Sequence, residues 1–164
     1  GRWRIALLNG PLDTVPGAAR HGGFLDAIAN HELPNDDELR VLATDFTFDA
    51  GLPAARRLVD VEPDAVMCAN DLLAAAAVRA FVDAGWRIPD DVAIVGMDDT
   101  ALAEQVTPTL TSVNLAAHRR AEVAAELLLA RIDEPDRAHQ RVVVDPTLTV
   151  RASTGAAVVA GDSR

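Results

Sequence analysis

The chain has little cysteine and few aromatic residues. Cys68 is the single cysteine among 164 residues, aromatic residues make up 4%, and tyrosine is missing. One thiol excludes a disulfide framework and a cluster of thiolate ligands, and it fits a reducing compartment. A surface that stacks on successive nucleic-acid bases needs several aromatic side chains, so this composition argues against such a surface.

Basic residues are also scarce. The sequence has 15 Lys+Arg against 25 Asp+Glu, which gives a formal net charge of −10. An acidic chain repels phosphate backbones, so we expect this polypeptide alone to be a poor nucleic-acid binder. At 49% hydrophobic residues it can nevertheless bury the core of a globular domain.

Long apolar segments are missing as well. The longest stretch with few charges, residues 72–82, is broken by Arg79 and falls short of the roughly 20 residues that span a membrane. No leader is visible near Gly1, so we expect no membrane association and a cytoplasmic location. Because the chain starts without methionine, we also expect it to be part of a longer protein.

The sequence has none of the common enzyme signatures. It lacks a phosphate loop, a dinucleotide-binding glycine motif and a Gly-x-Ser-x-Gly nucleophile turn. The four histidines are spread without ligand spacing, at His21, His31, His118 and His139. We therefore expect no metal, no cofactor and no catalytic activity. Cys68 has no histidine near it in sequence, which favours a buried structural thiol over a nucleophile.

Short apolar runs alternate with amphipathic stretches along the first hundred residues. This pattern predicts strands over residues 4–9, 40–46, 65–69 and 92–96, and helices over 18–29, 49–61 and 71–84. Continuous apolar strands that alternate with helices indicate an α/β fold, with a parallel sheet flanked by helices on both faces.

The order of elements changes after Asp99. Residues 107–114 read as extended, 115–132 as a long helix, and 140–144 and 147–151 as two further strands. The tail after Ser153 is weakly patterned, and we expect it to be loose. The long helix has an apolar face and a polar face. The apolar face carries Ala121, Ala124, Ala125, Leu128 and Ile132. We expect this face to fold back on the sheet or to pack on a second chain, because a bare apolar face is a liability.

Ligands of parallel α/β sheets bind at the carboxyl ends of the strands. The residues just past the predicted strands are Asn9, Phe46, Asn70 and Asp98. Asn70 reads either as a helix N-cap or as an amide that bonds a ligand hydroxyl. Both interpretations are compatible if Asp71 caps the helix while Asn70 faces the ligand.

Each of the other candidate residues also has a purely structural interpretation beside the ligand-binding one. Asp98 and Asp99 read either as caps of a short helix over 101–104 or as acceptors for ligand hydroxyls. Phe46 reads as core or as a flat wall for a ligand. Arg20 reads as a solvated helix residue or as a planar donor fork at the cleft.

Taken together, these residues resemble one family, the effector-binding domain of LacI/GalR-family transcriptional regulators. The resemblance covers nearly the whole chain, from Arg4 to Thr154, and the motifs that carry it follow one another in order. They are Arg20-x-x-Gly23-Phe24, Thr44-Asp45-Phe46-Thr47 with Gly51, Ala69-Asn70-Asp71 with Ala74, Gly85-x-x-Ile88-Pro89-x-Asp91-Val92, Val95-Gly96-x-Asp98-Asp99, Pro108-x-Leu110-Thr111 and Val150-Arg151-x-Ser153-Thr154. Each motif is weak alone, and their order and spacing make the set specific.

The resemblance implies a periplasmic-binding-protein-like type I fold with two lobes around a small molecule. Residues 1–110 would form most of the carboxy-terminal lobe. Residues 111–146 would supply a crossover strand, a helix and a strand to the amino-terminal lobe, 147–154 would cross back, and 155–164 would be a loose tail. The rest of the amino-terminal lobe and the DNA-binding head would lie outside this chain.

The resemblance also implies a site and a function. The ligand-binding residues would be Arg20, Phe46, Asn70 and Asp98, with Asp99 bracing its neighbour. The chain would be the sensor part of a sugar-responsive regulator, with a nucleobase or nucleoside as the second ligand class. The regulator would reach operator DNA through its missing head, and form a homodimer through segments 71–84 and 101–107. Closure of the lobes would shift the dimer between states that present the DNA-binding heads well or badly.

Two competing functions remain open on the sequence. A secreted solute-binding protein of the same fold would share the cleft, and a small hydrolase could use Asp98 or Asp99. The chain also departs from the family pattern in three places: Met97 stands where an aromatic residue is common, Ala76 replaces a frequent glycine, and residues 109–112 differ from Pro-Leu-Thr-Thr. Met97 lies beside Asp98 and is expected to alter the shape of the pocket.

Overall fold

The computed structural model describes residues 3–155, which form one mixed sheet flanked by helices. The strands are β1 (Ile5–Asn9), β2 (Arg40–Leu42), β3 (Ala65–Cys68), β4 (Ala93–Met97), β5 (Thr111–Asn114) and β6 (Thr147–Thr149). They lie in the order β2-β1-β3-β4-β5-β6. The first five are parallel, and β6 runs antiparallel to β5. The predicted α/β class with a largely parallel sheet is confirmed.

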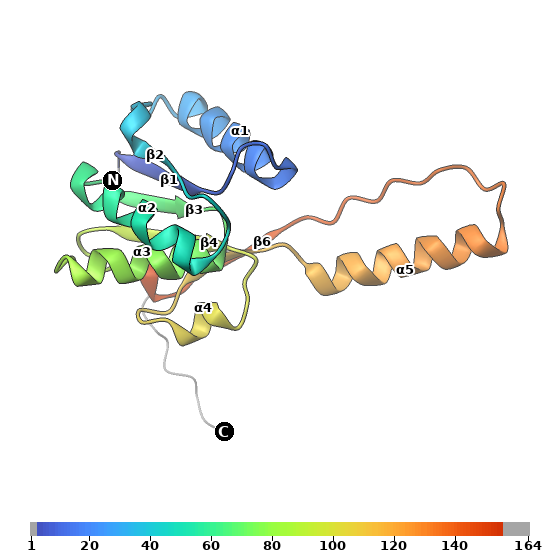
Figure 1. Cartoon of the computed structure of the whole chain (residues 1–164). Helices are drawn as coiled ribbons and strands as arrows, with labels where there is room; N and C mark the ends of the chain where they lie inside the picture. Colours follow the sequence, from blue (N-terminus) through green and yellow to red (C-terminus); the bar gives the residue numbers. More distant parts are fainter. Residues whose placement is uncertain (1–2, 156–164) are drawn as a thin grey trace, which may run out of the picture.

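The two faces of the sheet are covered unequally (Figure 1). The helices are α1 (Val15–Asn30), α2 (Phe48–Val61), α3 (Asp71–Asp83), α4 (Leu102–Gln105) and α5 (Ala117–Asp133), with short 3-10 turns η1 (Asp37–Leu39) and η2 (Ala152–Thr154). Helices α2 and α3 pack side by side against one face and form the main core with it. Leu8, Leu73 and Phe81 are fully buried there. On the other face α1 forms a smaller cluster around Leu7 and Phe24.

Most predicted elements are present, with changed boundaries. Helix α1 begins at Val15 rather than residue 18, because the Thr14 side chain accepts from the Gly17 N–H and caps the helix. Strand β2 stops at Leu42 rather than residue 46, because its partner β1 ends at Asn9, opposite Leu42.

Cys68 lies in the main core and is fully buried. Burial raises the pKa of its thiol, and the nearby charge of Asp71 raises it further. The thiol therefore stays neutral, as expected for a structural cysteine.

The chain leaves the sheet after β5 and returns in β6. Between them, α5 and residues 134–146 form an arm that projects away from the body (Figure 1). The predicted strand over 140–144 is wrong: these residues are irregular, because no other strand of the described chain lies beside them to supply backbone partners. The expectation that the long helix folds back on its own sheet is also wrong.

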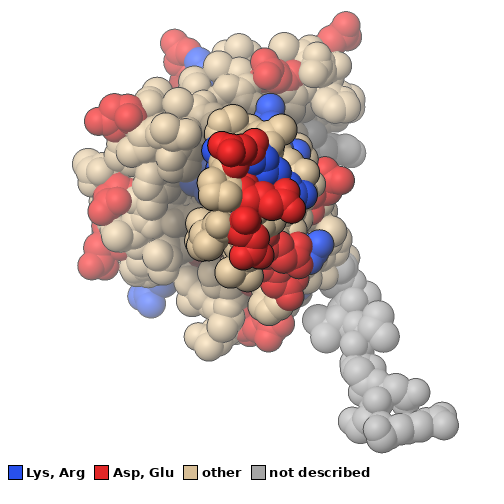
Figure 2. Space-filling view, turned by 90° about the vertical axis from the view of Figure 1, so that its right-hand side faces the viewer, with Lys and Arg blue, Asp and Glu red and all other residues tan. Residues whose placement is uncertain are grey.

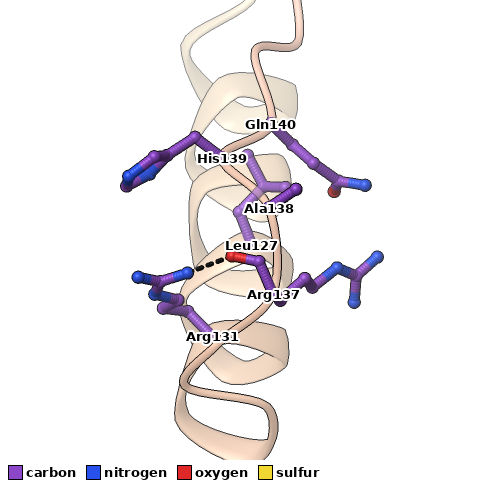
Figure 3. Close-up of a pocket in the computed structure, with 6 residues that line it drawn as sticks. All are labelled: Leu127, Arg131, Arg137, Ala138, His139 and Gln140. Carbon is purple, nitrogen blue, oxygen red and sulfur yellow. Dashed lines mark hydrogen bonds between the residues drawn. The ribbon is translucent and has the colours of Figure 1, made fainter.

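The return segment contacts a different face of α5 from the apolar face that the sequence predicts. Val123 is buried, whereas Leu128 and Ile132 are 62% and 63% exposed. Figure 3 gives a close view of one shallow hollow between helix and return segment, of about 280 Å³, where the Arg131 guanidinium donates to the Arg137 carbonyl. The apolar face of α5 is therefore bare within residues 3–155.

No helix among the described residues is long and apolar enough to cross a bilayer. Nor do three or more His, Cys, Asp or Glu side chains gather there as a set of metal ligands. On the face seen from the arm's tip in Figure 2, acidic side chains predominate over basic ones. Segment 156–164, which holds most of the predicted loose tail, lies outside the described residues.

Candidate functional site

The four predicted site residues meet at the carboxyl edge of the sheet. Arg20 lies on α1, Phe46 lies in the loop between β2 and α2, Asn70 lies directly before α3, and Asp98 directly follows β4. Parallel strands bring their carboxyl ends to one edge of the sheet. Residues as distant in the sequence as Arg20 and Asp98 therefore converge there. The arm leaves the sheet from the same edge, after Asn114 at the end of β5.

Arg20 is the centre of the group. Its Nη2 lies 3.7 Å from Asp98 Oδ1, and its Nε donates to the Met97 sulfur at 3.2 Å. Its guanidinium carbon lies 5.7 Å from the centre of the Phe46 ring, within reach of a cation–π contact. The Arg20 side chain is 17% exposed, so its planar fork is held in a defined place rather than free in solvent. The solvated alternative for Arg20 is wrong.

Phe46 is half-buried and packs over the start of the loop after β1. A Cβ on Gly10 would collide with the Phe46 ring, so only glycine lets the ring lie this close to the backbone. The ring thus packs against the backbone at Gly10, and the Arg20 guanidinium lies over the ring.

Asn70 caps α3 and also bonds the loop that carries Phe46. Its Oδ1 accepts from the Leu73 N–H at 2.8 Å and caps α3, while its Nδ2 donates to the Phe46 carbonyl at 2.8 Å. The expectation that Asp71 caps the helix in its place is wrong. An amide has two N–H donors and two lone pairs, so each half of Asn70 keeps one position for a ligand.

Asp98 has an unusual backbone and a perturbed carboxyl. Its φ is 101°, a region that residues with a side chain rarely adopt. Burial raises the pKa of Asp98, the Arg20 charge opposes this, and the Asp71 charge adds to it. The carboxylate side chain remains 37% exposed and open to a ligand hydroxyl.

Asp99 points away from the other four and joins the connecting strands. Its carboxylate accepts from Thr149 Oγ1 at 2.7 Å, Asn114 Nδ2 at 3.0 Å and Arg151 Nη1 at 2.7 Å. Burial would raise the pKa of Asp99, but these hydrogen bonds and the charge of Arg151 together lower it below the ordinary value. The alternative in which Asp98 or Asp99 caps a short helix is wrong, because α4 begins after Ala101 without a side-chain cap.

Two residues near the site have places that differ from what the sequence predicts. Asp71 is 2% exposed and bonds Thr100 and Ser112, contacts that join distant positions and leave no local signal. Conversely Asn9, the last residue of β1, is fully buried, and its Nδ2 donates to the Gly17 carbonyl in the first turn of α1. It takes no part in the group around Arg20.

Beside the four residues lies an apolar hollow of about 440 Å³. Its walls come from α1, β3 and β4. They include Arg20, Phe24, Met67 and Met97. Met97, the residue before Asp98, lines the hollow, whereas Asp98 does not.

Comparisons with known proteins agree with this geometry. Residues 1–154 match the family of periplasmic binding protein-like domains. The HTH-type transcriptional regulator CelR of Thermobifida fusca is 40% identical over 93% of this chain and 45% of its own length. Among solved structures, a complex of the transcriptional regulator CelR with cellobiose has a TM-score of 0.86 at 39% identity, over 93% of this chain and 47% of that one.

A regulatory protein of the LacI family from Chloroflexus aggregans also has a TM-score of 0.86, at 31% identity. The match covers 94% of this chain and 56% of that protein. The chain thus spans about half the length of the relatives it matches. The predicted resemblance is confirmed: the relatives described above are transcriptional regulators, one of them of the LacI family, and the chain belongs to the periplasmic binding protein-like family.

Proposed function

We propose that this chain is the sugar-sensing part of a LacI-type transcriptional regulator. The observation that carries the proposal is the convergence of Arg20, Phe46, Asn70 and Asp98 at the carboxyl edge of the sheet. We assign binding rather than catalysis, because these groups suit recognition and none forms a nucleophile–base pair.

The chemistry of the group fits a polyhydroxylated ligand. The Asp98 carboxylate accepts from hydroxyls, Arg20 donates two parallel N–H groups, and Asn70 can do both. Phe46 offers an apolar surface to the C–H face of a sugar ring. The relative solved with cellobiose supports a neutral sugar as the first ligand to test.

The cleft needs a second wall, which we assign to the rest of a longer protein. In this proposal residues 1–110 form the carboxy-terminal lobe, and residues 111–146 contribute to the other lobe. Residues 147–154 return the chain. The bare face of α5 supports this division, because Leu128 and Ile132 need an apolar partner that residues 3–155 do not supply. The partial coverage of the relatives is consistent with such a missing lobe.

We further propose that the protein acts as a homodimer. Helices α3 and α4 flank an apolar hollow of about 420 Å³ on the surface. Leu72 and Val82 border it and are 42% and 49% exposed. An exposed apolar surface of this kind suits a self-complementary interface.

DNA binding is assigned to a part of the protein outside this chain, and the protein to the cytoplasm, where operator DNA lies. The net charge of −10 makes this chain a poor partner for phosphates. A ligand that closes the two lobes would alter the relation between the DNA-binding parts of the dimer. The alternative of a secreted solute-binding protein is less favoured, because the matched relatives are transcriptional regulators.

The test uses the protein from its full reading frame. Its binding to a fluorescent DNA fragment from upstream of its own gene is measured by anisotropy, with and without cellobiose, other neutral sugars, nucleobases and nucleosides. We expect specific DNA binding that a neutral sugar shifts at least tenfold. Sugar binding without any DNA binding would support the solute-binding alternative, and an effect of nucleobases alone would contradict the sugar assignment.

A further inference from the structure

Asp71 is a buried carboxylate on which four segments of the chain meet. Its Oδ2 accepts from the Thr100 N–H at 2.7 Å and from Thr100 Oγ1 at 2.9 Å. Its Oδ1 accepts from Ser112 Oγ at 2.6 Å. Gly96 passes so close that a Cβ there would collide with Asp71 Oδ1. A buried charge is costly unless it is fully hydrogen-bonded, so these bonds define the place of the carboxylate closely.

The same bonds fasten the turn that carries Asp98. Asp98 and Asp99 have φ values of 101° and 51°, so the turn needs its surroundings to hold it. Its consecutive N–H groups donate to the Val113 carbonyl at 2.9 Å, Ser112 Oγ at 3.1 Å and Asp71 Oδ2 at 2.7 Å. Because Ser112 is itself bonded to Asp71, two of these three anchors depend on one carboxylate.

Asp71 is also the first residue of α3 and directly follows Asn70. The helix N-terminus stabilises its negative charge and fixes its position relative to the Asn70 cap. One residue thus ties the loop of Asn70 to the turn of Asp98, although these loops belong to different strands. We propose that Asp71 is a positioning residue of the effector site, which holds Asp98 at its working distance from Asn70 without touching the effector.

The inference rests on the proposed function, because its readout is effector binding. A residue that acts through Asp98 matters only while Asp98 can bind. Replacing Asp71 should therefore weaken binding strongly in the wild-type background and weakly once Asp98 is disabled. A residue needed only for folding lowers the melting temperature in both backgrounds and shows no such coupling.

The experiment is a double-mutant cycle in the full-length protein. The sugar is cellobiose, or the neutral sugar that shifts DNA binding most in the anisotropy experiment above. Its binding is measured by isothermal titration calorimetry in the wild type, Asp71→Asn, Asp98→Asn and the double variant. We expect Asp71→Asn to weaken binding about tenfold in the wild type and less than twofold in the Asp98→Asn background. Asp60→Asn, which changes an exposed aspartate on α2, is the matched control and should leave affinity unchanged.

Two further variants and readouts keep the proposal testable. If Asp71→Asn fails to fold, Ser112→Ala removes one of the two anchors and should weaken binding three- to fivefold. Affinity within twofold of wild type, or equal losses in both backgrounds, would overturn the proposal. If the wild type binds no sugar, the proposed function fails instead. In that case the positioning role is tested by amide hydrogen exchange at residues 98–100. Asp71→Asn should lower the protection of these amides, and unchanged protection would overturn the positioning role as well.

Discussion

Arg151 Nη1 donates to Asp99 Oδ1 at 2.7 Å, and this ion pair links the end of β4 to the segment that follows β6. Both side chains are largely buried, at 15% and 9% exposed. Thr149 and Asn114 bond the same carboxylate, so Asp99 joins the strand that leads into the arm to the strand that returns from it. Asp99 therefore braces the connection between the sheet and the arm, next to Asp98, which we propose binds the effector.

Replacing Asp99 by asparagine should destabilise the protein. Asparagine keeps the shape but loses the charge, and it places an N–H group opposite donors. Breaking a buried, hydrogen-bonded ion pair costs about 3–5 kcal/mol. We expect a loss near the lower end of that range in urea unfolding. The control is Asp83→Asn, which breaks the exposed pair with Arg79 and should cost far less, because solvent screens that pair. A loss for Asp99→Asn no larger than the control would contradict the bracing role.

The stabilising effect of Asp99 should depend on pH. An aspartate in an unfolded chain has a pKa of about 3.9, and the folded pKa of Asp99 lies lower. Its contribution is therefore complete above about pH 4 and is lost as the pH falls through the lowered folded pKa. Urea unfolding of wild type and Asp99→Asn from pH 7 downward should give curves that converge in acid. A gap that stays constant or widens in acid would show that the charge of Asp99 does not stabilise the fold.

Arg20→Lys should weaken effector binding without unfolding the protein. Lysine keeps the positive charge but loses the planar fork, the Nε–sulfur contact with Met97 and the broad contact with the Phe46 ring. We expect about a 10- to 100-fold rise in the dissociation constant for the effector, measured by titration calorimetry. Arg56→Lys, which changes an exposed arginine on α2, is the matched control. Equal affinities for both variants would mean that Arg20 recognises the effector by charge alone, or not at all.

Gly10→Ala should impair the site through Phe46. A Cβ at Gly10 would occupy the space of the ring, which must then turn away from Arg20. We expect effector affinity to fall several-fold, while the melting temperature falls only slightly because the ring lies at the edge of the core. Gly22→Ala is the control, because a Cβ there meets nothing within 4 Å. An undisturbed affinity in Gly10→Ala would show that the place of the Phe46 ring is unimportant.

The sequence predicts the layers of the fold well because each strand and helix has a local pattern. The predictions from sequence are wrong where a strand depends on a pairing partner that lies far away in the sequence or is missing from the described residues. Strand β2 ends where β1 ends, and residues 140–144 have strand-like composition but no neighbouring strand among the described residues. Local composition cannot indicate whether a partner strand is present.

For the site, too, local patterns predict the positions of residues but not their contacts with distant residues. The positions after the strands, together with the family resemblance, predict Arg20, Phe46, Asn70 and Asp98, and the structure brings these four together. The roles of adjacent residues were harder to assign. Asn70 and Asp71 are both good N-caps, and only the bonds from Asp71 to Thr100 and Ser112, 29 and 41 residues away, decide between them.

The most direct test is titration calorimetry of the full-length protein with cellobiose, followed by other neutral sugars, in the wild type and Asp98→Asn. The titration is repeated from neutral pH into acid. Wild type should bind one sugar per chain, and Asp98→Asn should bind at least tenfold more weakly, because asparagine cannot replace a charged acceptor. Wild-type affinity should also fall in acid at a higher pH than an ordinary aspartate requires, since burial raises the pKa of Asp98. Asp60→Asn, exposed on α2, should bind as wild type does. Equal sugar affinity in wild type and Asp98→Asn would contradict the site.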